Sequence, residues 1–441
     1  MLNNVIMNKL GKVVIWGCGI LGATNLIYLT KVGYKCLGID TNQKRLHELK
    51  LKRYSINSDT EVLNYYQQPE YHVELSNNFH DALNELCYIH FICIPTEKNG
   101  SPCSDIFYDV VDKILSVKRN NPILIVIEST IEPNWLDTMH EKIKLLNLTM
   151  GEDVLIATGP RRDLFGDKSF SLRNTNRVIS GDSDYTINLI KLLYGEYCDK
   201  LIIAKNNKYA MLSKIVENTY RFLDLTFTNM LSNCLSDLDM VHTLELAGTK
   251  WNMNTYHSSL GIGGYCIPLA PLYLSNEIEA INNNGLTILN HFLEFNNNHT
   301  NKQYNTIKTL LRDAKKIAVL GISYIANIKV FSGSLSPIII NNLIKDNFIV
   351  GIHDPFVSEE EISNQFVNCQ YINYPDSLNE YDAVIIMVAH DCYKNDIRKN
   401  LKPSCIIIDN LGVLADYQYD NYYELGREKI CWNRMDTTLA N

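Results

Sequence analysis

Short apolar runs alternate with helical patterns in two separate parts of the chain. In the first part, runs of strand length lie at residues 13–16, 35–40, 88–94, 123–128 and 153–158. In the second part, they lie at residues 316–322, 348–354, 383–388 and 405–409. Strands that alternate with helices are typical of parallel sheets covered by helices on both faces. The pattern therefore predicts an α/β fold class with two Rossmann-like, doubly wound domains.

The region between the two series is predicted to be helical. Residues 208–235 form one long helical pattern without Gly or Pro, and further helices are expected at 241–247, after residue 266, and at 304–313, beyond the three asparagines at 296–298. The long helix is apolar around more of its circumference than the core of one chain would cover. We therefore expect a central helical domain that joins two copies into a homodimer. The expected domains are residues 1–205, 206–300 and 301–441.

The composition excludes several classes of protein. Of 441 residues, 46% are hydrophobic and 20% are charged, which favours packed domains over disorder. The net charge of −8 and the lack of a long Lys/Arg run argue against a nucleic-acid partner. The twelve cysteines form no C-x-x-C pair, so no zinc ribbon or other metal site is expected. Without a signal-peptide layout or an apolar run of membrane-spanning length, the chain is expected to be cytoplasmic, with no membrane partner.

A glycine motif, G-x-G-x-x-G, follows the first predicted strand and opens a helical pattern. In a dinucleotide site the first glycine forms the tight turn, the second admits the pyrophosphate, and the third lets helix and strand pack closely. Asp40 ends the next strand, where a carboxylate accepts hydrogen bonds from the ribose and repels a 2′-phosphate, so NAD is favoured over NADP. The alternative is a glycine turn in another kind of α/β domain. The expected cofactor contacts here are Gly17, Gly19, Ile20, Leu21, Gly22 and Asp40.

Two later strands of the first series end in polar residues. Pro95 and Thr96 follow the run at 88–94, and Ser129 and Thr130 follow the run at 123–128. Ligands lie beyond the carboxyl ends of strands in an open parallel sheet, so Thr96 and Thr130 are candidate cofactor contacts. Ordinary turn and helix-cap roles explain them equally well. In the second series the first strand ends at Gly321 without further glycines, so no second dinucleotide is expected there, and a mononucleotide is left open.

One face of the long helix carries polar side chains. Lys214, Glu217, Asn218 and Arg221 recur at helical spacing and therefore share a face. A solvated stripe is the simplest explanation. Asn218 weighs against it, because asparagine is a poor helix former that often has a hydrogen bond to make in mid-helix.

A glycine-rich loop precedes Cys266 in the stretch LGIGGYCIPLAP. Gly261, Gly263 and Gly264 let the backbone approach a ligand closely. Pro268 is predicted to open a helix, which would place Cys266 at a helix N-terminus, where a thiolate nucleophile is stabilised. The alternative is an inert, buried cysteine in a glycine turn.

Taken together, these stretches resemble the UDP-sugar dehydrogenases, meaning the UDP-glucose, UDP-N-acetylmannosamine and UDP-N-acetylgalactosamine 6-dehydrogenases. The resemblance covers nearly the whole chain. It includes GCGILG with the following Asp40, then FICIPT, VIEST, KIVENTYR, GIGGYCIP, VLGISY, HDPFV, VAHDCY and IIIDNLGVL. The cysteine loop and the K-x-x-E-N-x-[FY]-R helix are the most specific of these motifs.

The resemblance implies an N-terminal NAD domain, a central dimerisation helix and a C-terminal UDP-sugar domain. It implies two hydride transfers at the sugar C6, from alcohol through aldehyde to acid. Cys266 matches the nucleophile that traps the aldehyde and passes to a thioester. Lys214 and Asn218 match the residues that hold a catalytic water and stabilise the C6 oxyanion, and Thr130 matches a threonine near that water. Substrate contacts are expected from Gly261, Gly263, Gly264, Arg221 and Arg161.

The chain also departs from the family pattern. Ala270 stands where the family has an aspartate that holds the water, and Arg161 stands where a glutamate assists thioester hydrolysis. Tyr265 replaces a histidine of some members, and Ile325 and Ser332 occupy the places of a lysine and an arginine that face the ligand. Acid–base assistance contributes roughly 10²–10⁴ in rate, so hydrolysis is expected to suffer unless Asp163, Glu128 or Glu217 substitutes.

These observations predict an NAD-dependent UDP-sugar 6-dehydrogenase that has diverged in its hydrolytic half. Two alternatives remain open. One is a dehydrogenase that stops at the aldehyde or passes the acyl group to an amine. The other is a non-catalytic nucleotide-sugar-binding paralogue, against which the joint presence of Cys266, Lys214 and Asn218 argues.

Overall fold

The computed structural model describes residues 11–54, 60–84, 86–117, 121–164, 168–235, 238–282, 287–415 and 421–425. The chain forms two compact units. Unit 1 comprises Met1–Asn218 and Leu272–Gly285, and unit 2 comprises Thr219–Pro271 and Leu286–Asn441. Two helices, α8 (Asn207–Cys234) and α10 (Cys266–Asn282), therefore begin in one unit and end in the other. No helix among the described residues is long and apolar enough to cross a membrane.

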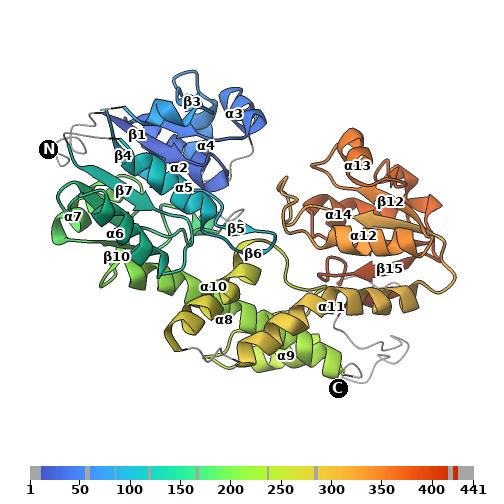
Figure 1. Cartoon of the computed structure of the whole chain (residues 1–441). Helices are drawn as coiled ribbons and strands as arrows, with labels where there is room; N and C mark the ends of the chain where they lie inside the picture. The colour runs from blue at the N-terminus through green and yellow to red at the C-terminus, as the bar shows by residue number, and fades with distance from the viewer. Residues whose placement is uncertain are drawn as a thin grey trace. The chain divides into compact units, whose positions relative to one another are not determined.

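Unit 1 is built on a twisted sheet with helices on both faces (Figure 1). Its strands are β1 (Lys12–Trp16), β2 (Lys35–Ile39), β3 (Glu74–Ser76), β4 (Cys87–Ile92), β7 (Ile123–Ile127), β8 (Val154–Thr158), β9 (Arg177–Gly181) and β10 (Leu201–Ile203), with a small hairpin of β5 (Glu97–Lys98) and β6 (Ser101–Pro102). Its helices are α2 (Ile20–Lys31), α3 (Gln43–Lys50), α4 (Thr60–Gln67), α5 (Asp105–Leu115), α6 (Trp135–Leu145) and α7 (Asp184–Gly195), with short 3-10 helices η1 (Phe79–Ala82) and η2 (Lys168–Phe170).

The strand order in unit 1 is β10-β9-β8-β7-β4-β1-β2-β3, and only β8 and β9 pair antiparallel. The order reverses direction between β4 and β1, which is the switch point where open α/β sheets bind ligands. Side chains of one face, such as Val13 and Phe91, pack with residues of α2 and α7 in a single core. The glycine motif lies directly after β1, at this switch point.

Unit 2 combines helices with a second sheet. Its strands are β11 (Lys316–Leu320), β12 (Ile349–His353), β13 (Gln370–Tyr371), β14 (Ala383–Ile386), β15 (Ile406–Asp409) and β16 (Tyr422–Glu424). Its own helices are α9 (Met240–Gly248), α11 (Thr287–Leu311), α12 (Ser336–Lys345), α13 (Glu359–Gln365) and α14 (Asp391–Asp396), with 3-10 helices η3 (Asp376–Glu380) and η4 (Ile397–Asn400).

The second sheet has the order β13-β12-β11-β14-β15-β16, and its pairs are parallel. Alternate residues of β11 face opposite cores: Ile317 and Val319 pack with α11 and α12, whereas Ala318 and Leu320 pack with residues of η3 and α14. Both faces are therefore covered, which explains why the strands read as continuous apolar runs. The doubly wound α/β fold expected for both parts is confirmed.

Two features of the middle region differ from expectation. The asparagines at 296–298 do not interrupt the chain but lie inside α11, which begins at Thr287 instead of near residue 304. Pro268 does not open its helix, because α10 already begins at Cys266. Proline fits any position of a first helical turn, where its missing N–H has no helical acceptor.

Candidate functional site

The glycine loop after β1 has the geometry of a dinucleotide cradle. Gly17 has a φ of +88°, and a Cβ there would lie 2.4 Å from the carbonyl oxygen of Cys93. A Cβ on Gly22 would lie 1.8 Å from the carbonyl oxygen of Gly17, so only glycine lets the helix pack this closely. A Cβ on Gly19, in contrast, would meet nothing within 4 Å. Space is therefore left open at the start of α2, at Ile20 and Leu21, where a pyrophosphate fits the helix N-terminus.

Asp40 lies directly after β2 and is buried. Its carboxylate accepts the N–H of Cys18 at 2.7 Å and the N–H of Asn42 at 2.8 Å, so it fixes the glycine loop to the end of β2. The Arg45 guanidinium lies 2.8 Å from the same carboxylate. Sequence reasoning considered Asp40 alone. The neighbouring cation weakens the argument that charge repulsion at this carboxylate excludes a 2′-phosphate.

Thr96 and Thr130 come together at the carboxyl ends of β4 and β7. The Thr96 hydroxyl donates to the carbonyl oxygen of Thr130 at 2.6 Å and lies 2.8 Å from the Tyr273 hydroxyl. The Tyr273 hydroxyl also lies 2.6 Å from the carbonyl oxygen of Thr96. Ser129 accepts the N–H of Ile94 at 2.9 Å. Both threonines therefore lie at the expected edge of the sheet, and their contacts with a cofactor remain a prediction.

Arg161, one of the expected substrate contacts, lies in a buried cluster of charged side chains. Its side chain is buried and makes a double ion pair with Asp163, with both N···O distances at 2.7 Å. It also donates to the carbonyl oxygen of Leu21 at 3.2 Å and to the Asn25 side chain at 3.3 Å. Burial alone would lower the pKa of Arg161, but the Asp163 charge outweighs it and raises that pKa. Arg161 thus connects the turn after β8 with Leu21 and Asn25 of α2, and its contact with a substrate stays a prediction.

Two of the three carboxylates considered as substitutes for the base expected from the resemblance contact arginines in the same cluster. Asp163 is held by Arg161; burial would raise the Asp163 pKa, but the Arg161 charge and hydrogen bonds outweigh it and lower that pKa. Glu128 is buried and contacts Arg177, the Tyr194 hydroxyl at 2.6 Å and the Asn25 amide at 2.6 Å. Both carboxylates are therefore engaged by cationic or hydrogen-bonding side chains of the protein.

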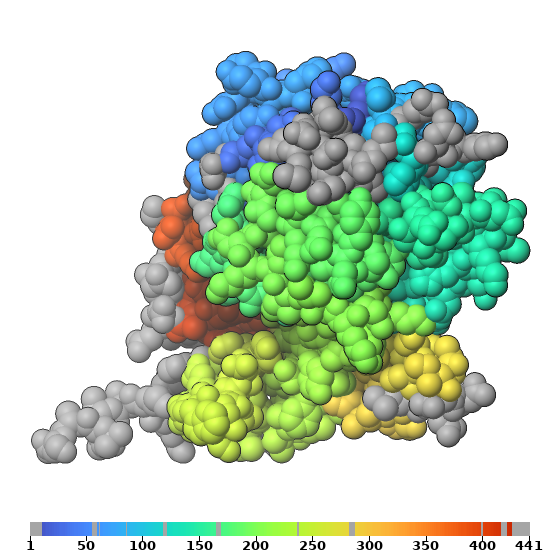
Figure 2. Space-filling model, turned by 90° about the vertical axis from the view of Figure 1, so that its left-hand side faces the viewer, coloured from blue at the N-terminus to red at the C-terminus, as the bar shows by residue number. Residues whose placement is uncertain are grey.

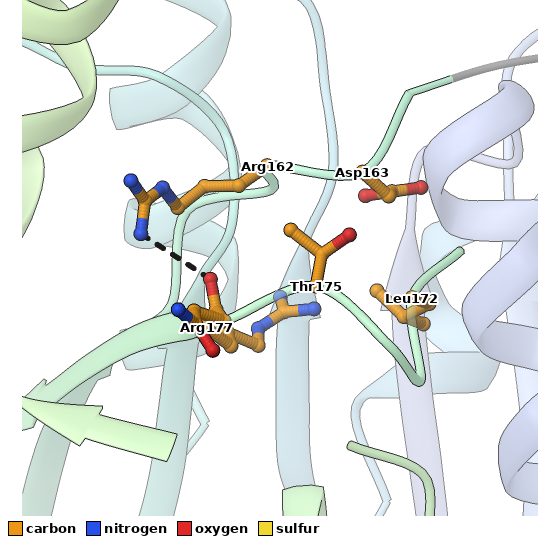
Figure 3. A pocket seen from close by; sticks show the side chains of 6 residues that line it. Arg162, Asp163, Leu172, Thr175 and Arg177 are labelled. Carbon is orange, nitrogen blue, oxygen red and sulfur yellow. Dashed lines mark hydrogen bonds between the residues drawn. The ribbon is translucent and has the colours of Figure 1, made fainter. Parts of the chain in front are cut away.

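A small pocket adjoins this cluster (Figure 3). It is lined by Arg162, Asp163, Leu172, Thr175, Asn176 and Arg177. The Arg162 guanidinium extends away from Asp163 and donates to the carbonyl oxygen of Asn176 at 3.3 Å (Figure 3). Its other contact is with Glu217 of α8, at 2.8 Å. Arg162 thus connects the turn after β8 with the long helix.

The polar face of α8 carries a connected set of side chains. The Lys214 ammonium lies 2.9 Å from one oxygen of Glu217 and 3.4 Å from the amide oxygen of Asn218. The other oxygen of Glu217 accepts from Arg162. Arg221 follows one turn later, and its guanidinium lies over the Tyr256 ring at 5.8 Å. These contacts connect the side chains of this helix face to one another and, through Arg162, to the turn after β8.

Cys266 is exposed and is the first residue of α10, as expected for a thiol at a helix N-terminus. The loop before it is packed against residues of the second sheet's loops. Gly264 donates its N–H to the carbonyl oxygen of Gly333 at 2.8 Å, and a Cβ on Gly264 would lie 2.3 Å from the Tyr324 ring. The Tyr324 pKa is raised, first by burial and then by the nearby Cys266, while Arg221 opposes the shift. Tyr324 and Cys266 are therefore close enough to interact electrostatically.

Three asparagine side chains hold the backbone of the cysteine loop. Asn229 accepts the N–H of Ser259 at 3.0 Å, Asn410 accepts the N–H of Leu260 at 2.8 Å, and Asn296 accepts the N–H of Ile262 at 3.3 Å. Sequence reasoning missed all three. The only available signal was the presence of asparagine in helical or strand-terminal positions, where it is not favoured by propensity.

The loop after β11 is fixed by a buried acid–histidine pair. Asp354 accepts the N–H groups of Ile322 and Ser323 at 2.9 and 2.8 Å, and its oxygen lies 3.2 Å from His390 Nε2. His390 Nδ1 in turn accepts the N–H of Asn327 at 2.9 Å. This loop also carries Ile325, where the resemblance expects a lysine. The family pattern D-x-R-x-S-P, aligned on Ser336 and Pro337, has its arginine at Ser334 and not at Ser332. The framework of this loop is thus built without those charges.

The sequence matches three domains of one family. The NAD binding domain of the UDP-glucose/GDP-mannose dehydrogenase family matches residues 11–198, the central domain matches residues 208–298, and the UDP binding domain matches residues 318–416. The chain belongs to this family. It is an NAD-dependent oxidoreductase of the UDP-sugar dehydrogenase kind, and the open glycine cradle fits that cofactor.

Relatives match along nearly their full lengths. The chain is 25% identical over 430 residues to the UDP-N-acetyl-D-mannosamine dehydrogenase of Methanococcus maripaludis, covering 91% of this chain and 93% of the relative. It is 26% identical over 432 residues to the UDP-N-acetyl-D-glucosamine 6-dehydrogenase of Pseudomonas aeruginosa, covering 95% and 98%. These identities are low, as expected for a divergent member.

Solved structures share the fold. The UDP-D-ManNAc dehydrogenase of Pyrococcus horikoshii superposes with a TM-score of 0.80 at 20% identity, covering 95% of this chain and all of that one (100%). The UDP-N-acetyl-mannosamine dehydrogenase Cap5O of Staphylococcus aureus superposes with a TM-score of 0.78 at 23% identity, covering 94% and 99%. The arrangement of two α/β domains and a central helical domain is therefore that of this family.

Proposed function

We propose that this enzyme oxidises the C6 alcohol of a UDP-sugar to the acid level through a thioester on Cys266. The observation that carries the proposal is the exposed thiol at the first residue of α10, presented by a loop that three asparagines hold. Lys214 and Asn218, held together on one face of α8, supply the matching pair for a C6 oxyanion.

The proposed substrate class is a UDP-N-acetylhexosamine. Two relatives of nearly equal identity are named for UDP-N-acetyl-D-mannosamine and UDP-N-acetyl-D-glucosamine, and both match the chain almost end to end. These two sugars are epimers, and the choice between them depends on the shape of the pocket. Both therefore belong in the assay.

In the proposed reaction, NAD bound at the glycine loop would supply the hydride acceptor for two successive oxidations at the sugar C6. The first step removes a hydride and a proton from the alcohol and leaves the aldehyde. The Cys266 thiolate then adds to the aldehyde carbon, and Lys214 and Asn218 stabilise the resulting oxyanion. Loss of the second hydride converts the thiohemiacetal into a thioester, and water releases the acid and the free thiol.

Hydrolysis of the thioester is proposed to be the slow step. Ala270 is buried and cannot orient water, and Arg161 is locked in its ion pair with Asp163. Glu128 and Asp163 are engaged by arginines, so neither replaces the missing base. A slow final step makes the acyl-enzyme accumulate, and an added amine can then compete with water.

Rapid mixing with NAD and each UDP-N-acetylhexosamine tests this proposal. We expect a burst of NADH, a slower steady state, and an intact-protein mass increase that maps to Cys266. Cys266→Ser should abolish the burst and the mass increase. Fast release of free acid without a burst would show that another group acts as base, and no NADH with any UDP-sugar would favour a non-catalytic binding protein.

We also propose that two copies associate through α8 and the neighbouring α9 region. Tyr220 and Phe227 lie seven residues apart on one face of α8 and are 67% and 53% exposed. Trp251, just after α9, is 91% exposed, and Figure 2 shows the yellow-green segment around α9 on the surface. Exposed aromatic side chains of this size favour a subunit contact.

Sedimentation equilibrium at micromolar concentration measures this association. We expect a dimer for the native chain and a shift toward monomer for Phe227→Lys, because a charge at the centre of an apolar contact is not solvated. A native chain that sediments as a monomer would contradict the proposal.

A further inference from the structure

Three charged side chains form a chain of contacts between the turn after β8 and the polar face of α8. Arg162 Nε donates to Glu217 Oε2 at 2.8 Å, and Arg162 Nη2 lies 2.8 Å from the same oxygen. Glu217 Oε1 accepts from Lys214 Nζ at 2.9 Å. Each oxygen of the Glu217 carboxylate is thus bound by a different cation. All three residues belong to unit 1.

The side chains are partly shielded from water, so their charges matter to each other. The exposed fractions are 14% for Lys214, 29% for Glu217 and 30% for Arg162. Two cations and one carboxylate give the group a net charge of +1. Without Arg162 the net charge would be zero, and the whole Glu217 charge would act on Lys214 alone.

The net charge of this group affects how strongly the Lys214 ammonium can attract a negatively charged oxygen. An ammonium has three N–H donors, and Glu217 and Asn218 account for two of them. If Glu217 were paired with Lys214 alone, its carboxylate would compete with a developing oxyanion for the Lys214 ammonium. A carboxylate shared with an arginine holds the ammonium in position while leaving its charge uncompensated.

We propose that Arg162 is a positioning residue that neutralises Glu217 and so keeps the charge of Lys214 available to the C6 oxygen. The role of Lys214 in this inference rests on the proposed function. Glu217, the third carboxylate considered as a substitute base, is then an anchor for Lys214 instead of a proton acceptor, because both of its oxygens are bound by cations.

The test compares Arg162→Gln, Glu217→Gln and the double variant by steady-state NADH formation. We expect Arg162→Gln to lower kcat about tenfold, with less than a twofold change in KM for the UDP-sugar, because the oxyanion forms only during the reaction. Arg162→Lys should recover most of the loss. The double variant should regain kcat to within about threefold of the native enzyme, because it again presents a net charge of +1.

Rescue by the second substitution separates this role from a structural one. If Arg162 and Glu217 only stabilised the fold, removing both would not restore kcat. Arg173→Gln is the matched control, since it breaks an exposed ion pair with Asp199 in the same unit, and it should leave kcat unchanged. A native kcat for Arg162→Gln, or a double variant no better than Arg162→Gln, would overturn the proposal.

A second measurement does not depend on catalysis. The rate at which acetic anhydride modifies Lys214 is followed by peptide mass. It is compared in the native chain, Arg162→Gln, Glu217→Gln and the double variant. We expect a severalfold lower rate in Arg162→Gln, because Glu217 then pairs with Lys214 alone, and a rate near the native one in the double variant. Equal rates in all proteins would refute the inference. If the rates follow this order while the native chain oxidises no UDP-sugar, the proposed function fails and the charge arrangement stands.

Discussion

Arg161 shows how one substitution changes the chemistry that its position can support. The family pattern places a glutamate here, and the chain buries an arginine against Asp163, Asn25 and the carbonyl oxygen of Leu21. Glu128 also lies 3.8 Å from its guanidinium. The arginine thus compensates two carboxylates below the glycine loop. Restoring the family glutamate would place a third carboxylate beside them.

We expect Arg161→Glu to lower the free energy of unfolding by about 3–5 kcal/mol, because it leaves buried carboxylates without their cation. Arg161→Met should be less harmful, since it removes the cation without adding a negative charge. Urea denaturation measures both, with Arg173→Glu at an exposed ion pair as the control. If Arg161→Glu and the native chain unfolded at the same urea concentration, the cluster would tolerate a third carboxylate.

We expect the Asp40–Arg45 ion pair to determine how the adenosine ribose of NAD is bound. Asp40→Ala should weaken NAD binding by about tenfold or more, because it removes a ribose acceptor and the contact that holds Cys18 N–H. Arg45→Ala should retain NAD binding and reduce any binding of NADP, because the remaining carboxylate is no longer paired. Calorimetry with both dinucleotides tests this, and equal affinity of the native enzyme for NAD and NADP would contradict the role given to Asp40.

At the level of elements, the cysteine loop depends on its contact with Tyr324. Gly264→Ala should destabilise the protein beyond the ~1–2 kcal/mol expected for a side chain at positive φ, since the new Cβ would also clash with the Tyr324 ring. Gly100→Ala is the matched control: Gly100 has a φ of +78°, but a Cβ there meets nothing within 4 Å. Thermal unfolding compares the two variants. A smaller loss for Gly264→Ala than for Gly100→Ala would show that the ring moves aside easily.

Elements with strong periodicity were predictable, and those shaped by tertiary contacts were not. The apolar runs identified the central strands of both sheets, and the uninterrupted pattern at 208–235 matched α8 within a residue at each end. The start of α11 was missed because asparagine disfavours helices, while Asn296 accepts a hydrogen bond from the cysteine loop that compensates for it. The contacts of Arg161 with Glu128, Asn25 and Leu21 could not be foreseen, because these partners lie on other elements, although Asp163 is only two residues away in the same turn.

At the scale of the whole molecule, sequence order and compactness divide the chain differently. The sequence suggested three successive domains, and the family's three domains follow the same order. Contacts within the folded chain divide it into two compact units, and α8 and α10 each contribute residues to both. Periodicity reveals that a helix exists but not which core each half joins, since that depends on contacts between distant segments.

The buried side chain of His353 is expected to make the free energy of unfolding depend on pH. It is buried at the end of β12, stacked on Tyr374 at 4.6 Å between ring centroids. Burial lowers its pKa to about 4, with Asp354 opposing the shift and His390 adding to it. Asp354 itself has a pKa lowered to about 2: burial opposes the shift, and hydrogen bonds from His390 and backbone N–H groups outweigh it. The two groups therefore act in different pH ranges.

Between the ordinary histidine pKa of about 6.5 and the folded value of about 4, the unfolded chain binds a proton at position 353 that the folded chain does not. Stability is therefore complete above about pH 6.5 and falls as the pH drops toward 4, by up to about 3 kcal/mol from this residue. His299, whose pKa is also lowered by burial, adds in the same direction. Below pH 4, protonation of Asp354 removes further stability.

His353→Phe keeps an aromatic ring beside Tyr374 but cannot bind a proton. We expect its urea midpoint to depend less on pH between 7 and 4.5 than that of the native chain, while His299 leaves part of the dependence in place. His242→Gln is the control, because His242 is 63% exposed and should not alter the slope. Parallel pH profiles for the native chain and His353→Phe would contradict the role given to His353, since a ring that never titrates cannot produce the native slope.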